Sequence, residues 1–592
     1  MITVWLALSL AVITGLFLAL LESAHTASGA YYLDLCARSA ADSLLADYHR
    51  DLWERYRVFG LEEYADEEIR DELYAYTEVY RDPAANRTWG GLSFTPEDIR
   101  VTDTKTLLSE GGGPLREEIL SYMRLAWPLS EETTESFRSF TERAAAERTA
   151  EDVSEWVGGM TGSAVEMAEA AGRICKEADL LRQNKAVLIS AAEYGDRAAF
   201  TERASEMREH AENIKALTRA CRKASERYDA ETADHREDAK DTKALREKLD
   251  GLAAYTDRFL RDLTEAEGFS EEAEREEAEE EDADNERLRA IWHSARRAAE
   301  ELSMPDSFWT GRTMDGEKLG QLKSAGALLS AGLLEVLLLP EGASVSEETI
   351  RVPEAPSLAA GSPSGTEIFS LADRALLSEY VLRHMECYQK DGGEGKLQAE
   401  YVLYGLESDR ADLSAAVCEG MAIRTGEGLL SLLADAKKRK EAEALSAAVT
   451  GGMPGTMEAL TFVILVLWAA WQAASDLKVL LAGGKVPAIR SGKEFTVSLS
   501  DILSGKISGE DEGTGIDSRD ALRLMLIMHM DGERVLRMAD VMQYEMGFIQ
   551  EDFRMRRMVT ELEAVVSARE MHVFSLKGTY EMQTTVRRSY CR

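Results

Sequence analysis

The first fifty residues carry two hydrophobic patterns that join without a break. The twenty residues from Ile2 to Leu21 contain no charge, and a helix of that length rises ~30 Å, the thickness of a bilayer's hydrocarbon core. Beyond Glu22, apolar residues recur at the three- and four-residue spacing of an amphipathic helix. The positions with this spacing are Tyr32, Leu35, Cys36, Ala40, Leu44 and Tyr48. The pattern predicts one long helix, its first half in lipid and its second half outside.

A cleavable signal peptide is the alternative interpretation of the apolar run. Such a peptide begins with positive charge, has an apolar core of about 7–15 residues and ends at small residues. Ser28, Gly29 and Ala30 suit a cleavage site, but the first basic residue is Arg38 and the run is longer than such a core. We therefore expect the segment to be retained as a membrane anchor.

Three more elements are expected before residue 130. Residues 66–82 have the pattern of a short amphipathic helix, and residues 97–108 alternate as an imperfect strand. Three glycines at 111–113 break the chain, and Pro114 suits the first turn of a helix. The residues of that helix expected to face a core are Ile119, Tyr122, Met123 and Ala126.

The middle of the chain predicts long helical arms. Residues 131–303 are dominated by Ala, Glu, Arg and Lys, and no proline lies between Pro128 and Pro305. This composition is typical of antiparallel helices in a coiled-coil hairpin or bundle. The expected breaks between arms lie at 157–163, 194–196 and 250–255.

Residues 271–286, within these arms, include eleven acidic side chains. An EF-hand calcium loop requires Gly at its sixth position, and "DADNER" has none there. A solvated face with mutually repelling charges is therefore expected rather than a cation site.

The C-terminal part begins after residues 340–365, which are rich in Pro, Ser and Gly and are expected to be a linker. A helix over 365–388 and a half-buried strand over 396–405 are expected next. Two helices are expected over 408–451.

The tail alternates polar and apolar residues over 554–570 and again over 578–590, which predicts an antiparallel pair of strands. The predicted fold is mainly α with a small antiparallel sheet (α+β). The expected parts are a transmembrane anchor (1–22), a stem helix with the first part of an α+β head (23–130), acidic helical or coiled-coil arms (131–303), a helix with the linker (304–365) and the rest of the head (366–592).

A second apolar run, residues 459–475, allows two interpretations. Its seventeen uncharged residues rise ~25 Å, at the lower limit for crossing a bilayer. Trp468 and Trp471 lie inside the run rather than at its edges, unlike an aromatic belt. A buried core helix of the head is expected, with a second membrane span as the alternative.

The charge excludes one class of partner. The chain has 107 acidic and 69 basic residues, a net charge of −38. Such a surface repels phosphate backbones, so no nucleic-acid partner is expected. It also disfavours broad docking onto anionic lipid, but it keeps a protein soluble beside a membrane.

The cysteines do not indicate a metal site or a dense disulfide framework. No two of them form a CxxC, and no histidine lies at zinc-finger spacing from any of them. Free thiols are expected, with a bridge between Cys387 and Cys418 as the alternative. The six cysteines are Cys36, Cys175, Cys221, Cys387, Cys418 and Cys591.

No catalytic motif is present. The chain lacks GxSxG, HExxH, GxGxxG and the P-loop pattern, and its eight histidines are isolated from one another in sequence. His25, just past the apolar run, and His529, in "LMLIMHMD", are expected to be interface or core histidines. We therefore expect no catalytic, cofactor-binding or metal-ligating residues, no cofactor and no enzymatic activity.

The opening "ITV", followed by an apolar helix, "LLES", small residues and a stem rich in Asp, Arg and Tyr, resembles TadE-like pseudopilin-related proteins of tight-adherence (Flp-type) pilus systems. It is also similar to a large uncharacterised family of single-anchor proteins encoded near such loci in Gram-positive bacteria. The stretches that carry this resemblance are "RDLWERYRVFGLEEY" (50–64), "GGGPLREEILSYMRLAWP" (111–128), "AEYVLYGLESDRADL" (399–413), "LWAAWQAASDLKVLLAGGKVPAIRSG" (467–492) and "DALRLMLIMHMDGERVLRMADVMQYEM" (520–546).

The resemblance implies a single-pass membrane protein, largely extracytoplasmic, that assists or caps pilus assembly. Pilins of this type have a Gly cleavage point followed a few residues later by Glu. Here Trp5 follows "ITV", and Glu22 lies at the far end of the run, so prepilin-peptidase processing is not expected. Glu22 is instead interpreted as an interfacial carboxylate where the helix leaves lipid. The anchor is expected to contact lipid between Ile2 and Leu21.

Small residues form one ridge along this helix, which would let a partner helix approach closely. The expected partners are pilin-like or other pilus-assembly components, or copies of the chain itself. Chance in an Ala-rich segment and packing of the stem on its own head are the alternatives. The ridge positions are Ala11, Gly15, Ala19, Ser23 and Ala27. The rival function is a membrane-tethered coiled-coil scaffold or sensor unrelated to pili, in which the arms drive oligomerisation.

Overall fold

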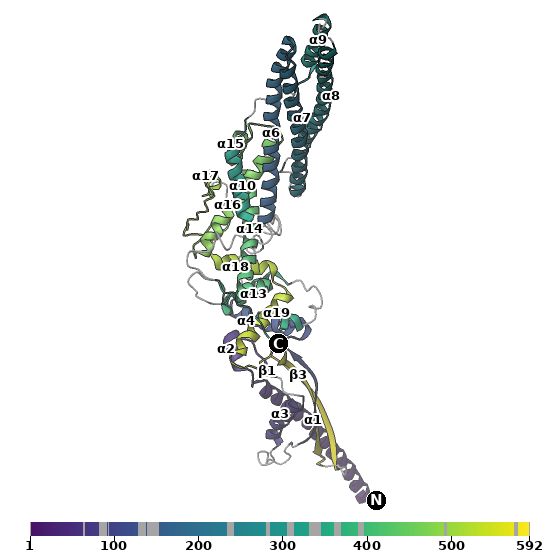
Figure 1. Ribbon diagram of the computed structural model, residues 1–592. Helices are drawn as coiled ribbons and strands as arrows, with labels where there is room; N and C mark the ends of the chain where they lie inside the picture. The colour runs from purple at the N-terminus through teal and green to yellow at the C-terminus, as the bar shows by residue number, and fades with distance from the viewer. Residues whose placement is uncertain are drawn as a thin grey trace.

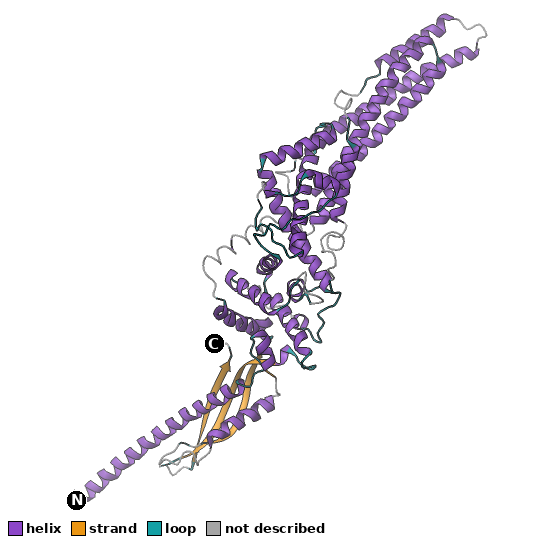
Figure 2. Cartoon of the chain, turned by 90° about the vertical axis from the view of Figure 1, so that its left-hand side faces the viewer, coloured by secondary structure: helices purple, strands orange, loops and turns teal. Residues whose placement is uncertain are grey.

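The chain forms an elongated, mainly helical molecule with one small antiparallel sheet (Figure 1). The N-terminus lies at one extreme and the tip of a helical bundle at the other, in two views at right angles (Figures 1 and 2). This computed structural model describes residues 2–62, 66–81, 92, 94–127, 138, 153–233, 239, 242–279, 285–304, 313–330, 345–359, 369–388, 396–490, 494–573 and 578–590.

Helix α1 (Ile2–Leu45) is continuous through the end of the apolar run, as the sequence predicts. Its second half buries one face, but Leu35 is 52% exposed because it lies away from the sheet on which the helix packs. The buried residues of α1 are Gly29, Leu33, Cys36, Ala37, Ala40, Ala41, Leu44 and Leu45. Most of them are small, which lets the helix axis approach the sheet closely.

Strand β3 (Met558–Met571) is the centre of the sheet, and it pairs antiparallel with every other strand. Its partners are β1 (Leu61–Glu62), β2 (Thr95–Thr106) and β4 (Thr579–Ser589). The predicted strand at 97–108 and the predicted tail hairpin are thus confirmed to within a few residues.

The second half of α1 packs on this sheet together with α3 (Asp66–Glu78), which is followed by the single turn η1 (Val79–Arg81). Alternate β3 residues, from Leu562 to Ala568, face the helix. We call this unit the base (Figure 2). The sheet therefore lies along the stem rather than in a separate head, and the two ends of the chain build the base together.

Above the base lies a middle tier of helices with its own core. Glu110, Gly111 and Gly112 have positive φ and interrupt the start of α4. Its regular part therefore begins near Pro114, as predicted. Ile119 and Met123 are buried there, whereas Tyr122 is half-buried and Ala126 exposed. The helices of this tier are α2 (Arg50–Tyr56), α4 (Ser109–Ala126), α11 (Pro356–Ala359), α12 (Leu371–His384), α13 (Gln398–Tyr404), α18 (Ser518–His529) and α19 (Gly532–Gly547), with the turn η5 (Met555–Arg557).

The strand expected over 396–405 is wrong, because this segment is the helix α13. Ala399, Val402 and Leu403 are all buried, at the three- and four-residue spacing of a helix. Over so short a stretch, apolar and polar residues also alternate by chance. The contacts of this segment with the rest of the middle tier favour the helix.

The distal tier contains the helical arms and the hydrophobic core with the most buried residues among those described. Two of the three expected breaks are wrong, because α6 runs through 157–163 and α8 runs through 250–255. The helices of this tier are α6 (Val153–Tyr194), α7 (Arg197–Glu231), α8 (Lys243–Glu279), α9 (Asn285–Glu301), α10 (Gly316–Ser330), α14 (Asp409–Ala434), α15 (Ala436–Thr450), α16 (Thr456–Leu481) and α17 (Leu499–Ser504).

The glycines of α6 permit close helix packing rather than a break. A Cβ at Gly158 would lie 2.9 Å from the side chain of Ser330 on α10, and one at Gly326 would lie 2.8 Å from Thr161. The break at 194–196 is real, since Gly195 has φ +68° and α7 begins directly afterwards.

The described part of the expected linker, residues 345–359, packs on α19. Gln543 Nε2 donates to the Pro353 carbonyl at 2.7 Å, and the Ser357 N–H donates to Asp540 Oδ1 at 3.0 Å. The remaining linker positions lie outside the described residues, as do residues 280–284 of the acidic run. The described part of that run is solvated, with the Glu271 side chain 71% exposed.

Candidate functional site

The first half of α1 projects beyond the rest of the molecule with no protein around it (Figure 2). Two described helices, α1 and α16, are long and apolar enough to cross a membrane by length and composition. None of the most apolar 18-residue stretch of α1 is buried within the molecule, whereas 83% of the corresponding stretch of α16 is buried. The two apolar segments thus have opposite environments. Residues 459–475 form a buried core helix as expected, but this helix packs with the arms in the distal tier and not in an α+β head.

All but one of the residues predicted for the anchor and its ridge are exposed on α1. The exposed ones are Ile2, Trp5, Ala11, Gly15, Ala19, Leu21, Ser23 and Ala27. Nothing lies within 4 Å of a Cβ placed at Gly15. The described part of the chain therefore leaves this ridge uncovered, and packing of these five small residues on the protein's own head is not seen.

Glu22 is the exception, because it contacts the far end of the chain. Its Oε1 lies 2.7 Å from Nδ1 of His572, the residue that directly follows β3. The two side chains are only 14% and 16% exposed. The carboxylate that ends the apolar run is thus paired within the protein rather than free at the helix surface.

A second pair lies one helical turn further along α1. His25 Nε2 is 3.7 Å from Glu570 Oε1, and the other oxygen of Glu570 accepts a short hydrogen bond from the hydroxyl of Tyr580 on β4. Burial and the neighbouring carboxylates raise the pKa of Tyr580 above its usual range. We call Glu22, His25, Glu570, His572 and Tyr580 the junction cluster.

Gly29 lets α1 approach the junction cluster. A Cβ at this position would lie 2.2 Å from Glu570 Oε2 and 2.8 Å from the Tyr580 hydroxyl. Any larger residue would displace that hydrogen-bonded pair or push α1 off the sheet. The sequence presented Gly29 only as part of a cleavage site, so this role was not predicted.

The chemistry of the junction cluster is that of a clamp. Each imidazole lies beside a carboxylate: His572 is within hydrogen-bond distance of Glu22, whereas His25, at 3.7 Å, is too far from Glu570 for a hydrogen bond. Among the described residues, no three His, Cys, Asp or Glu side chains come together as a metal site. His572 and Glu570 were not predicted from the sequence, because their pairing with α1 depends on which end of the hairpin meets Glu22.

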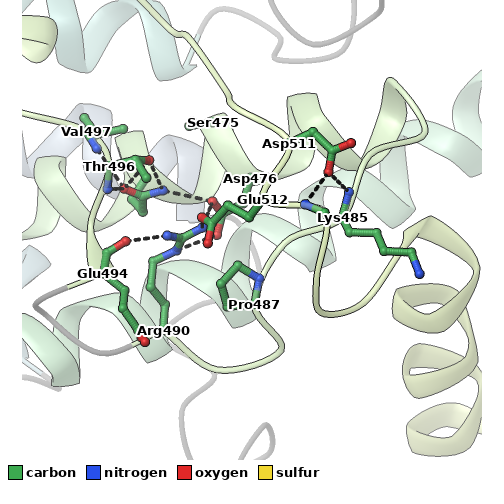
Figure 3. A network of polar contacts seen from close by, with 12 residues as sticks. Ser475, Asp476, Lys485, Pro487, Arg490, Glu494, Thr496, Val497, Asp511 and Glu512 are labelled. Carbon is green, nitrogen blue, oxygen red and sulfur yellow. Dashed lines mark hydrogen bonds and ion pairs between the residues drawn. The ribbon is translucent and has the colours of Figure 1, made fainter.

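A second polar cluster is buried where α16 meets the loop after it (Figure 3). Arg490 Nη2 lies 2.9 Å from Asp476 Oδ1 and 2.8 Å from Glu512 Oε1, and its backbone N–H donates to Glu427 Oε1 at 2.7 Å. Arg490 and Asp476 are 4% and 5% exposed at their side chains. Arg424 adds a second guanidinium 3.5 Å from Asp476.

This network supplies partners for the polar residues of an otherwise apolar helix. Gln472 on α16 donates to Asp476 Oδ1 at 2.9 Å and accepts from the Thr496 and Val497 N–H groups. The Trp468 and Trp471 indoles donate to backbone carbonyls at 2.8 Å and 3.0 Å. Because these groups are satisfied inside the protein, the network is a structural tie and not an open site.

The buried carboxyl group of Glu400 is a third candidate site. Glu400 Oε1 accepts from the Tyr388 N–H at 2.9 Å, and Oε2 has no hydrogen-bond partner among the described residues. Burial raises the pKa of Glu400 to about 7. It lines a mostly apolar pocket of about 60 Å³ together with Cys387.

The described cysteines offer no further chemistry. No disulfide joins any two of the described cysteines Cys36, Cys175, Cys221, Cys387 and Cys418, so the alternative bridge between Cys387 and Cys418 is not seen among the described residues. His529, the other histidine singled out from the sequence, lies 2.6 Å from Glu419 in the middle tier as an interface residue. Cys591 lies outside the described residues.

Comparison with known proteins adds little about function. The profile of a family of unknown function, DUF5702, matches residues 312–570, a little under half of the chain. The matched part runs from α10 to the end of β3 and therefore includes the Arg490 network and Glu570, but not α1, His572 or β4. No curated protein and no solved structure matches the chain.

Proposed function

We propose that this protein is a membrane-anchored structural or assembly protein with most of its mass outside the cytoplasm, acting as an accessory or pseudopilin-like component of a tight-adherence type pilus system. The observation that supports it best is the environment of α1: its first twenty residues are uncharged and uncovered, while the following residues are bound tightly to a sheet. In water such a segment exposes far more apolar surface than a soluble protein tolerates.

The mechanism follows from the mechanical continuity of α1. Its 44 residues rise ~66 Å, so one rigid element passes from the bilayer into the base. The base then supports the middle and distal tiers, which present their surfaces away from the membrane. The pilus assignment itself rests on the sequence resemblance, and the uncovered ridge at Ala11, Gly15 and Ala19 is the surface on which a pilin-like helix would pack.

Flotation of the full-length protein with phospholipid vesicles tests the anchor. Leu10→Arg with Val12→Arg places two charges near the bilayer centre, each costing about 2.5–3.5 kcal/mol of insertion free energy, so the fraction that floats should fall sharply. Leu125→Arg is the matched control, because Leu125 is 88% exposed on α4, outside the anchor. If the double variant floats as well as the parent protein, α1 is not the anchor.

Labelling of a distal residue tests the orientation. Tyr194 is 82% exposed at the end of α6, so Tyr194→Cys should react with a membrane-impermeant maleimide on intact, wall-stripped cells. The parent protein, labelled in parallel, reports the reaction of the native cysteines. Labelling only after lysis would place the distal tier in the cytoplasm and contradict the extracytoplasmic assignment.

Photo-crosslinking from the ridge tests the partner. A crosslinking amino acid at Gly15 should capture a small pilin-like membrane protein, and one at Phe17, on the opposite face of α1, should do so far less. Equal capture from both faces would argue against a defined helix partner.

The alternative, a tethered scaffold, is favoured by one feature of the arms. Leu180, Val187 and Tyr194 recur every seven residues on α6 and are 39%, 47% and 82% exposed. The buried apolar residues of the arms, in contrast, pack against neighbouring arms of the same chain. If Val187→Glu converts a detergent-solubilised oligomer to a monomer, as measured by light scattering, the scaffold becomes the better assignment.

A further inference from the structure

Two exposed apolar side chains lie beside the junction cluster, where the last hairpin closes. Met571 ends β3 and is 70% exposed, and Val573 is 50% exposed. Met571 is paired with Thr579, the first residue of β4, so both side chains belong to the closing end of the β3–β4 hairpin. His572, between them, turns inward to Glu22. The described protein leaves the two apolar side chains uncovered.

The contact with Glu22 fixes where these side chains lie along α1. Glu22 is the first charged residue after the apolar run, so it marks the level at which α1 leaves the hydrocarbon core. His572 touches it at 2.7 Å, and the Cα atoms of its two neighbours are each only ~3.8 Å from its own. Met571 and Val573 therefore lie at the same level as the boundary between acyl chains and headgroups.

We propose that the end of β3 is a second membrane contact, in which Met571 and Val573 insert into the interface of the leaflet from which α1 emerges. This inference rests on the proposed function, since it requires α1 to be the anchor. Its partner is the lipid bilayer itself.

The charge distribution specifies how this contact forms. With a net charge of −38 the chain gains nothing from anionic headgroups, so insertion of apolar side chains, and not charge attraction, makes the contact. The junction cluster serves the same purpose, because it pairs Glu22 and Glu570 with imidazoles close to lipid, where an unpaired carboxylate is costly.

A second membrane contact restricts the orientation of the protein more than α1 alone does. A single helix in a bilayer tilts and rotates about its own axis, and its orientation is set by neighbours and by interfacial anchors. A second contact beside the first restricts both movements. The elongated tiers above the base are thereby held in a defined orientation to the membrane surface.

Site-specific fluorescence tests the proposal in full-length protein reconstituted in vesicles. Met571→Cys and Val573→Cys are each labelled with an environment-sensitive NBD dye, after replacement of Cys387, Cys418 and Cys591. Cys36, Cys175 and Cys221 stay, because they are buried and react slowly. Thr585→Cys is the control: it is exposed on β4 and lies six residues beyond Thr579, ~20 Å away along the strand.

Nitroxide-labelled lipid should quench the dye at 571 and 573 about twofold or more relative to 585, and aqueous iodide should quench it correspondingly less. The same result in purely zwitterionic vesicles is expected, since charge is not the driving force. Equal iodide access at all three sites in protein that floats with vesicles overturns the second contact and leaves the anchor intact. Protein that does not float at all overturns the proposed function instead. Protection from iodide without lipid quenching would assign the two side chains to a protein partner and also overturn the proposal.

Discussion

At the scale of single residues, Gly29 shows how one missing side chain positions an entire helix. It lies where α1 passes closest to the sheet, and the space its Cβ would take is filled by the hydrogen-bonded Glu570 and Tyr580. Gly15, in the same helix, has nothing within 4 Å of its Cβ position. The two glycines therefore have different reasons to be small, and substitutions can separate them.

We expect Gly29→Leu to destabilise the base and Gly15→Leu to leave it unchanged. Leucine suits a helix equally at both positions, so helix propensity cancels in the comparison. Overpacking at Gly29 should lower the free energy of unfolding by about 1–3 kcal/mol, seen as a lower Tm of the detergent-solubilised protein. Equal Tm values for the two variants would show that α1 and the sheet separate without cost at this point.

Glu118 gives a prediction about pH. It is 5% exposed, its Oε2 accepts the Phe59 N–H at 2.8 Å, and burial raises its pKa to about 8. The folded protein thus keeps a proton that the unfolded chain releases near pH 4.5, so stability falls as the pH rises from about 4.5 to 8.

Glu118→Gln cannot ionise, so it should lose this part of the pH dependence. At pH 8–9 the variant should be more stable than the parent by on the order of 3 kcal/mol, and at pH 4–5 the two should be similar. Urea unfolding at both pH values measures this. Glu117→Gln is the control, since the Glu117 side chain is 47% exposed. A pH profile identical to that of the parent would show that Glu118 is ionised in the folded protein.

At the scale of elements, the sequence was informative wherever a pattern was long. Continuous spacing over α1 and period-two alternation over β3 and β4 left little choice of structure. The seven-residue helix α13 was mistaken for a strand, because a stretch that short fits both periods. The glycines of α6 were mistaken for a break, because their packing against α10 is a tertiary contact that one segment does not reveal.

The polar network between α16 and the loop after it leads to a prediction at this scale. Arg490→Met should cost about 3 kcal/mol of stability, because it leaves the Asp476 carboxylate buried with only the more distant Arg424 for a counter-charge. Adding Asp476→Asn should recover part of that loss, since the double variant no longer buries the unpaired charge. Chemical unfolding of the single and double variants gives the coupling.

The exposed ion pair between Lys437 and Glu441, at 3.9 Å, provides the comparison. Lys437→Met should change stability by less than about 1 kcal/mol, as is typical of surface pairs. If Arg490→Met behaves like Lys437→Met, the network in Figure 3 does not hold the loop after α16 in place.

At the scale of the whole molecule, the chain leaves the base, builds two tiers and returns to close the sheet on its own N-terminal helix (Figure 1). The sequence predicted the long N-terminal helix and the hairpin separately, but nothing in either pattern indicated that they pack together. Residues 22 and 572 are brought into contact only by the path of all the helices between them. The junction cluster was therefore beyond prediction from local patterns.

This closure predicts that loss of one imidazole loosens only the base. His572→Ala removes one partner of Glu22, and the loss of a hydrogen bond to a half-buried carboxylate costs about 1–3 kcal/mol. Hydrogen exchange should therefore rise at the end of β3, the start of β4 and residues 22–30 of α1, while the arms stay protected. His529→Ala breaks a similar pair with Glu419 of α14, where the middle and distal tiers meet, so it should raise exchange there and not in the base. If both variants loosen the same segments, or neither does, the two chain ends are held together by the apolar packing of α1 on the sheet, and the clamp contributes nothing measurable.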